Sequence, residues 1–239
     1  MKKDPKLIVA LDVDSYKKAV RLIKTLSRYV KVFKVGSVLF TKCGPKIIRH
    51  IHKRGAKVFL DLKFNDIPTT VSNAAVEATK LGVYMLNVHA LSGKEAMRLT
   101  AEAVSKQAKK LHIFKPILVA VTILTSLHEE DLSPLGVRGE IEELVSRLAK
   151  VAKESGFDGV VASANETHMI KEKFGNDFIV VTPGIRPKWA SEQADQKRIM
   201  TPKEAIKNGS DFIVIGRPII KARKPVKAVK EILKEIGSK

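Results

Sequence analysis

The sequence predicts an α/β fold, a (β/α)8 TIM barrel that forms a single domain over residues 1–239. Three observations support this prediction. Short apolar runs rich in Val and Ile alternate with longer segments of helical periodicity, as in parallel strands joined by covering helices. Eight such units follow one another without a linker or a shift in composition. A chain of 239 residues also has a usual length for one barrel.

Each predicted strand is a short apolar run that ends at a polar residue or a turn signal. Runs of this kind are typical of parallel strands buried on both faces. The eight runs are LIVALDV (7–13), VKVFKVG (30–36), AKVFLDLK (56–63), VYMLNVHA (83–90), PILVAVTIL (116–124), DGVVAS (158–163), FIVVTPG (178–184) and DFIVIGR (211–217).

The segments between these runs are amphipathic, and they predict eight helices. Gly55, Gly82 and Gly156 stand where helices should end, while Pro202 and Pro225 suit a first helical turn. A doubly wound sheet is the architectural alternative, but LDVDS after the first run is not a glycine-rich dinucleotide motif. The helices are expected at 15–28, 44–54, 69–81, 93–110, 140–155, 165–174, 202–208 and 225–236. Two longer connections, 125–139 and 184–201, are expected to be functional loops.

The chain is strongly basic, with 44 Lys and Arg against 25 Asp and Glu and a formal net charge of +19. A basic nucleic-acid-binding protein is therefore one alternative, and it would bind in a steeply salt-dependent manner. The basic residues are scattered, however, and their small clusters contain no interleaved stacking aromatics. We therefore expect no specific nucleic-acid partner, and a positive field that attracts a phosphorylated substrate.

Cysteine and apolar content indicate the compartment. The single cysteine, Cys43, excludes an intramolecular disulfide framework and a cysteine-based metal cage. Asp12 and Asp14 interrupt the first apolar run, which is too short for a signal peptide. No apolar stretch approaches the length of a membrane span. We expect a cytoplasmic protein without a membrane partner.

The functional signal is a set of polar residues at the ends of the apolar strands. In a barrel, the carboxyl ends of the strands converge on one face, where the active site is assembled. Charged groups in apolar strands are costly to bury unless they are paired. These residues therefore predict an active site, and they are Asp12, Lys34, Asp61, Lys63, Thr125, Arg186 and Arg217.

The densest part of this signal is DLKFNDIPTTV at 61–71. Because side chains alternate along a strand, Asp61 and Lys63 are expected on the same side. The carboxylate of Asp61, reinforced by Asp66, favours the ammonium form of Lys63. A lysine kept protonated in this way suits proton delivery to a carbanion. For an isolated Asp-x-Lys, a structural ion pair remains the alternative.

Six motifs extend the pattern over essentially the whole chain. They are ALDVD (10–14), FKVG (33–36), DLKFNDIPTTV (61–71), VTPGIR (181–186), DQKRIMTP (195–202) and VIGRPI (214–219). Together they resemble the orotidine 5′-monophosphate decarboxylase family. The resemblance implies decarboxylation of orotidine 5′-monophosphate to uridine 5′-monophosphate and CO2, the last step of de novo UMP biosynthesis. It also implies that no metal or organic cofactor takes part, and that the enzyme is a homodimer with an active site shared across the interface.

The resemblance also assigns roles. Lys63 would be the proton donor, and Asp66 with Ile67 would come from the neighbouring subunit. The charge network at the reacting carbon would consist of Lys34, Asp61, Lys63 and Asp66. Gly216 permits close backbone approach to a phosphate, which the guanidinium of Arg217 can grip. The substrate-binding set would be Asp12, Lys34, Asp61, Ile67, Thr70, Thr125, Arg186, Gln196, Gly216 and Arg217.

A related decarboxylase on the same barrel, which acts on 3-keto-gulonate 6-phosphate, is the enzymatic alternative. That group shares the Asp-x-Lys-x-x-Asp pattern but uses a magnesium ion, which requires further acidic ligands at strand ends. Here the second strand carries Lys34 where such a ligand is expected. The sequence therefore favours the metal-free reaction.

Overall fold

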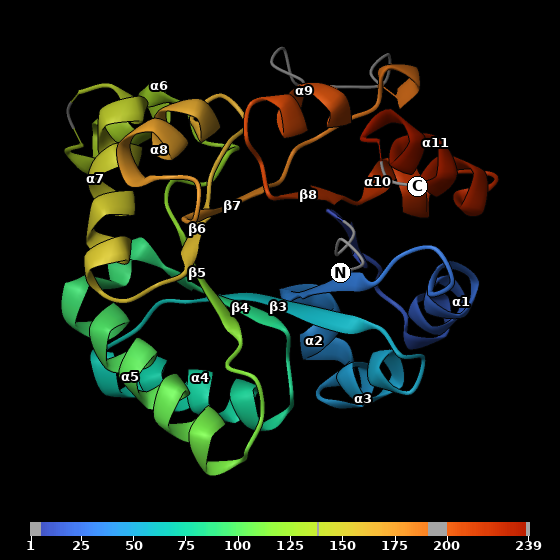
Figure 1. The fold of residues 1–239 in the computed structure, drawn as a ribbon, viewed down its shortest axis with the longest axis horizontal. Coiled ribbons are helices and arrows are strands. Elements are labelled where there is room, and N and C mark those ends of the chain that lie inside the picture. The colour runs from blue at the N-terminus through green and yellow to red at the C-terminus, as the bar shows by residue number, and fades with distance from the viewer. Residues whose placement is uncertain (1–5, 138, 191–199, 238–239) are drawn as a thin grey trace.

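The computed structural model describes residues 6–137, 139–190 and 200–237. In this part of the chain, eight parallel strands form a closed barrel in the order β1 to β8 (Figure 1). Pairing of Leu7 with Ile213 and of Ile8 with Val214 closes the ring between β1 and β8. The predicted TIM barrel is thereby confirmed. The strands are β1 Leu7–Ala10, β2 Val32–Gly36, β3 Lys57–Phe64, β4 Met85–His89, β5 Ile117–Val121, β6 Gly159–Val161, β7 Ile179–Thr182 and β8 Phe212–Ile215.

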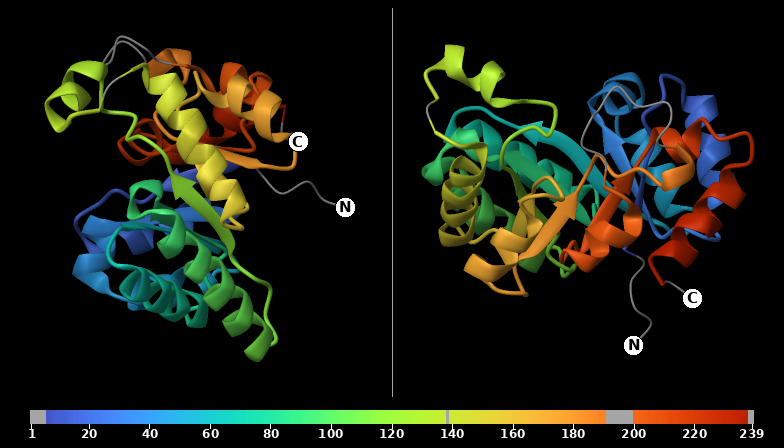
Figure 2. Two further views of the ribbon diagram at one scale, coloured as in Figure 1. Left: turned by 90° about the vertical axis from the view of Figure 1, so that its left-hand side faces the viewer. Right: turned by 90° about the horizontal axis from the view of Figure 1, so that it is seen from above.

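Helices surround the barrel, as the two turned views make plain (Figure 2). Eight of them follow the predicted segments within a few residues: α1 Tyr16–Leu26, α3 Lys46–His52, α4 Pro68–Lys80, α5 Lys94–Lys110, α7 Ile141–Glu154, α8 Thr167–Phe174, α9 Pro202–Lys207 and α11 Pro225–Glu235. Further helices and helical turns lie in the connections: α2 Ser37–Cys43, η1 Ala90–Ser92, α6 Glu129–Leu132, η2 Ser133–Leu135, η3 Lys188–Ala190 and α10 Arg217–Ile220.

The expected helix at 44–54 is present as α3, which is a few residues shorter. A further helix, α2, precedes it and ends at Gly44, whose φ is 55°. α2 was not predicted, since its sequence SVLFTKC continues the apolar run of β2 without a break. The result is a helix directly after β2, at the end of the barrel that carries the polar strand ends.

Two apolar layers hold the fold together. The inward side chains of the strands fill the barrel, among them Ile8, Val32, Phe59, Met85 and Val119. The outward side chains of the same strands pack against the helices in a larger layer. Because both faces of each strand are buried, the sequence shows continuous apolar runs rather than alternation. Few charged residues lie within the strands, and among them Lys34 in β2 and Asp61 in β3 belong to the polar set predicted from the sequence.

Several predicted strands extended too far into the connections that follow them. β1 ends at Ala10 rather than at residue 13, and β8 ends at Ile215 rather than at residue 217. Gly216, with φ −109° and ψ −94°, turns the chain after β8, so that Arg217 begins α10 instead of closing the strand. Among the described residues, no helix is long and apolar enough to cross a membrane.

Candidate active site

A cavity of about 300 Å³ lies among the carboxyl ends of the strands. Apolar residues from the barrel interior, such as Ala10, Phe59 and Val121, form part of its wall. The structure brings eight of the predicted site residues together here: Asp12, Lys34, Asp61, Lys63, Thr125, Arg186, Gly216 and Arg217. Residues from the ends of β1, β2, β3, β5, β7 and β8 thus meet in one place.

The carboxylate of Asp61 is the centre of the charged cluster. Its Oδ2 lies 2.9 Å from Nζ of Lys34, and its Oδ1 lies 2.7 Å from Nζ of Lys63. Lys34 also contacts Oδ1 of Asp12 at 3.1 Å. The result is an alternating row of charges, Asp12–Lys34–Asp61–Lys63, from the ends of three neighbouring strands.

Burial and charge oppose one another in this row. Burial alone would raise the pKa of Asp61, but the positive charges of Lys34 and Lys63 hold that pKa below its ordinary value. Burial would likewise lower the pKa of Lys34, yet the carboxylates of Asp61 and Asp12 raise it. The charged form of each group is therefore favoured by its partners.

Lys63 has an unusual backbone. Its φ is 50°, in the left-handed region that residues with a Cβ seldom adopt. The pairing of β3 with β4 shifts at the same place, since Leu60 pairs with Leu86 and Phe64 with Val88. Three residues of β3 therefore lie opposite one residue of β4, which is a β-bulge. The expected contact with Asp61 is present, but simple strand alternation is not what produces it.

The residue opposite the bulge is Asn87, which was not among the residues predicted for the site. Its Oδ1 accepts a hydrogen bond from the backbone N–H of Lys63 at 2.8 Å. Its Nδ2 donates to Oδ1 of Asp61 at 2.7 Å. The signal that was available is an asparagine inside the apolar run VYMLNVHA, where an amide is costly to bury unless it is bonded.

The arginines of the cavity differ in exposure. Arg186, following β7, is 9% exposed, while Arg217 is exposed at the start of α10. A Cβ added to Gly216 would lie 3.2 Å from Oδ2 of Asp12, so the absence of a side chain allows this close approach. Gln196, expected in the seventh loop, lies outside the described residues.

Three predicted residues do not line this cavity: Asp66, Ile67 and Thr70. All three are exposed, and the carboxylate of Asp66 accepts a hydrogen bond from the N–H of Ile67 at 2.6 Å. Ile67 is 64% exposed, and two other large apolar side chains from neighbouring connections, Val38 and Leu91, are 66% and 60% exposed. These three residues follow β2, β3 and β4.

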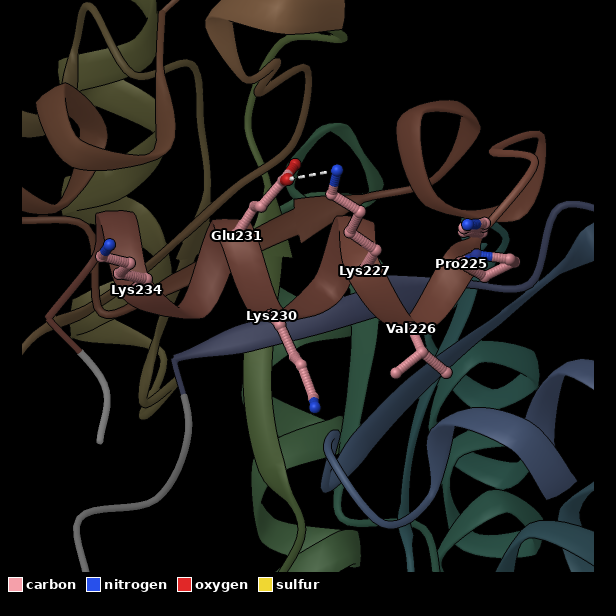
Figure 3. A pocket seen from close by; sticks show the side chains of 7 residues that line it. Pro225, Val226, Lys227, Lys230, Glu231 and Lys234 are labelled. Atoms are coloured by element: carbon pink, nitrogen blue, oxygen red, sulfur yellow. Dashed lines mark ion pairs between the residues drawn. The ribbon is translucent and has the colours of Figure 1, made fainter.

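A larger hollow, of about 720 Å³, lies on the outer face of α11 and includes Lys224, Lys227, Lys230 and Lys234. The side chains of Lys227, Lys230 and Lys234 point away from one another, and Lys227 is 3.7 Å from Glu231 (Figure 3). None of these residues belongs to the charged row. The chemistry therefore concentrates in the smaller cavity.

The donor set of the charged row suits ammonium groups. Both carboxylate oxygens of Asp61 are bound by lysine Nζ atoms, and a divalent cation would have to displace them. Throughout the described ranges, no cluster of three or more His, Cys, Asp or Glu side chains has the arrangement of a metal site.

Comparisons with known proteins agree over nearly the whole chain. The family model described as "Orotidine 5'-phosphate decarboxylase / HUMPS family" matches residues 5–232. The orotidine 5′-phosphate decarboxylase of Syntrophotalea carbinolica is 52% identical over 233 residues, which are 98% of this chain and 95% of the relative. That of Syntrophomonas wolfei is 48% identical over 238 residues, 99% of each chain.

Solved structures agree as well. The crystal structure of orotidine 5′-phosphate decarboxylase from Lactobacillus acidophilus has a TM-score of 0.83 at 39% identity, covering 98% of this chain and 99% of that one. The enzyme from Pyrococcus horikoshii has a TM-score of 0.75 at 27% identity, covering 97% and 99%. The chain thus shares its fold with these solved structures, and about half of its residues are identical in the two relatives named above.

Proposed function

Since the chain belongs to the orotidine 5′-phosphate decarboxylase family, whose reaction it catalyses in UMP biosynthesis, we propose that Lys63 donates the proton. The reaction converts orotidine 5′-monophosphate to uridine 5′-monophosphate and CO2. The observation that carries the proposal is the 2.7 Å contact between Lys63 and Asp61 inside the cavity. This contact holds the Nζ atom of Lys63 in a fixed position in the cavity, as a proton donor requires.

The reaction then proceeds in two parts. The bond between C6 of the pyrimidine and its carboxyl carbon breaks, and the electron pair stays on C6 while CO2 leaves. The ammonium of Lys63 stabilises this charge and transfers one proton to C6. The neutral amine recovers its proton from water. Asp61 supports the step by holding two ammonium groups in place, and Lys34 with Asp12 would contact the ribose hydroxyls.

The phosphate would bind beside the Asp12 end of the charged row, where β8 adjoins β1. Arg217 follows β8, where barrels often bind phosphate, and Gly216 lets a ligand approach the backbone. Arg186 adds a second guanidinium, held in a largely buried position. Thr125 would lie near the pyrimidine edge, and Gln196 joins the phosphate set by family resemblance alone.

We further propose a homodimer in which Asp66 and Ile67 reach the cavity of the partner. Asp66 has no ion pair with Lys63 within this chain, in the part that the structure describes. Exposed Val38, Ile67 and Leu91 supply apolar area on consecutive connections, and such groupings mark interaction surfaces. Thr70, one turn into α4, would lie at the same interface. A cytoplasmic location remains our expectation.

The reaction is proposed to need neither metal nor organic cofactor. Its test is an assay with orotidine 5′-monophosphate after exhaustive chelation, following the loss of ultraviolet absorbance. Undiminished turnover is expected. Strict dependence on added magnesium would contradict the proposal and favour the magnesium-using relatives on the same barrel.

A further inference from the structure

The side chain of Asn87 lies inside the barrel, directly below the charged row. Asn87 is only 1% exposed. It stands two residues after Met85, whose side chain belongs to the apolar filling of the barrel, and alternation gives both residues the same inward side. An amide in this position needs partners for its donor and its acceptor.

Both partners of Asn87 are in the proposed proton-transfer pair. Its Oδ1 accepts from the backbone N–H of Lys63, and its Nδ2 donates to Oδ1 of Asp61. The Oδ1 atom of Asp61 also accepts a hydrogen bond from the ammonium of Lys63 at 2.7 Å. One amide thus holds the backbone of the donor residue and the carboxylate that orients its side chain.

The backbone contact matters because Lys63 adopts an unfavourable conformation. A φ of 50° is costly for a residue with a Cβ, and such strain persists only where the surroundings over-determine it. The bulge removes the ordinary ladder partner of this stretch of β3, so that Asn87 replaces a strand hydrogen bond. Without the amide, the N–H of Lys63 would lose its partner and the strain would be unopposed.

We propose that Asn87 is a positioning residue for decarboxylation, which keeps the ammonium of Lys63 in place by fixing its left-handed backbone and the Asp61 carboxylate. The proposal rests on Lys63 being the proton donor. An amide is suited to this task because it offers a donor and an acceptor at once. A carboxyl group offers both only while it is protonated.

The first test is Asn87→Leu, which keeps the approximate size and removes both hydrogen bonds. The expected result is a loss in kcat of about 100-fold, the scale for a misplaced catalytic group. KM and the affinity for uridine 5′-monophosphate should change less than kcat, because the hydrogen bonds of Asn87 go to Asp61 and Lys63 and not to the residues proposed to contact ribose and phosphate. Ser210→Ala is the control. Ser210 is also buried, and its hydroxyl forms a 2.7 Å hydrogen bond with Thr182, which is not part of the charged row.

The second test is Asn87→Asp, assayed over a range of pH. While protonated, the introduced carboxyl can donate to Asp61 and accept from Lys63, which restores both hydrogen bonds. Once ionised, it repels Asp61. The variant should therefore be most active at low pH and lose kcat as the pH rises, over a range where the parent does not.

The charged and titratable surroundings of position 87 are few. Asp61 and Lys63 face it from β3. Lys34 on β2 is bound to Asp61 and does not contact position 87 directly. His89 lies two residues further along β4. β5, the other neighbour, consists of ILVAV and carries no titratable group. The new pH dependence would thus be attributable to the introduced carboxyl facing Asp61.

A folded Asn87→Leu protein that binds uridine 5′-monophosphate normally and retains full kcat would overturn the proposal. If that variant does not fold, Asn87→Asp decides alone, and a pH profile parallel to that of the parent would overturn it. Lys63→Ala separates the two hypotheses. Retained turnover in Lys63→Ala would refute the hypothesis that Lys63 is the proton donor. An inactive Lys63→Ala together with a fully active Asn87→Leu would refute only the positioning role of Asn87.

Discussion

Lys34 binds the Oδ2 atom of Asp61 at 2.9 Å, which leaves the Oδ1 atom of that carboxylate to Lys63. The two lysines thus share one counter-ion but differ in access, because the side chain of Lys34 is 12% exposed and that of Lys63 is 37% exposed. The more accessible ammonium is the one that a ligand in the cavity can meet. This difference supports Lys63, and not Lys34, as the donor.

Replacement of Lys63 should abolish decarboxylation without unfolding the barrel. We expect Lys63→Ala to reduce kcat by at least about 10²–10⁴-fold, the usual contribution of a positioned general acid. Lys115→Ala is a matched control. Lys115 is 36% exposed and contacts Asp158 at 2.8 Å, and it does not line the cavity. Steady-state kinetics and thermal unfolding check both. Substantial turnover in Lys63→Ala would remove the assignment.

Replacement of Arg217 should act through the phosphate. Arg217→Ala is expected to lower kcat/KM by about 10- to 100-fold, because a hydrogen bond to a charged group contributes about 1.5–3 kcal/mol. With orotidine, which lacks the phosphate, parent and variant should react equally slowly. Arg98→Ala on α5 is the control, since Arg98 pairs with Glu95 and Glu102 on the outer surface. An equal loss with both substrates would argue against phosphate binding.

Stability should depend on pH through Asp61. Because its pKa in the folded protein lies below the ordinary 3.8, the stabilising contribution of the carboxylate is complete above that value. It is lost as the pH falls through the folded-state pKa. Asp61→Asn leaves Lys34 without this partner and should cost about 3–5 kcal/mol near neutral pH.

Urea unfolding of the parent and of Asp61→Asn, from neutral to strongly acidic pH, measures this effect. The difference between their free energies of unfolding should shrink as the medium becomes acidic, because the parent then loses the same charge. Parallel curves over the whole range would show that the ion pairs of Asp61 do not stabilise the fold.

The shared active site can be tested by mixing two inactive variants. In a heterodimer of Lys63→Ala and Asp66→Asn, one of the two sites has its own Lys63 and a native Asp66 from the partner. Random pairing gives half heterodimers with one active site each, so about a quarter of the parent activity should return. Mixing Lys63→Ala with Lys34→Ala is the control, because both residues line the cavity of one chain.

Recovery in the first mixture and not in the second supports a site completed by the partner. No recovery in either mixture, from variants shown to exchange subunits, would place Asp66 outside the partner's site. Sedimentation of Ile67→Glu adds an independent measurement, since a charge in an apolar interface should lower the dimer fraction.

The sequence predicted the barrel because buried strands are uniformly apolar, and all eight runs contain a strand. The ends of the strands were less predictable, since Asp12 and Arg217 each stand two residues after the last strand residue and continue the alternating pattern of the strand. α2 was hidden for a similar reason. A helix of β-branched and aromatic residues directly after a strand has no boundary that periodicity can detect.

Within the site, the sequence identified the charged residues but not the backbone that arranges them. Alternation predicted the contact between Asp61 and Lys63, yet a bulge and a positive φ produce it. Neither feature has a residue signature here, because glycine, the usual residue at positive φ, is absent from the position. Asn87 could be recognised only once its two partners were known.

The close approach of Gly216 to Asp12 lies where the last strand meets the first. The proposed ribose and phosphate groups therefore come from the two extremes of the barrel sequence, on either side of the join. A refolding chain that has formed its helices and its other strand pairs still lacks a complete substrate site. Recovery of turnover should consequently lag behind recovery of helical circular dichroism, and the enzyme's own reaction becomes a reporter of ring closure.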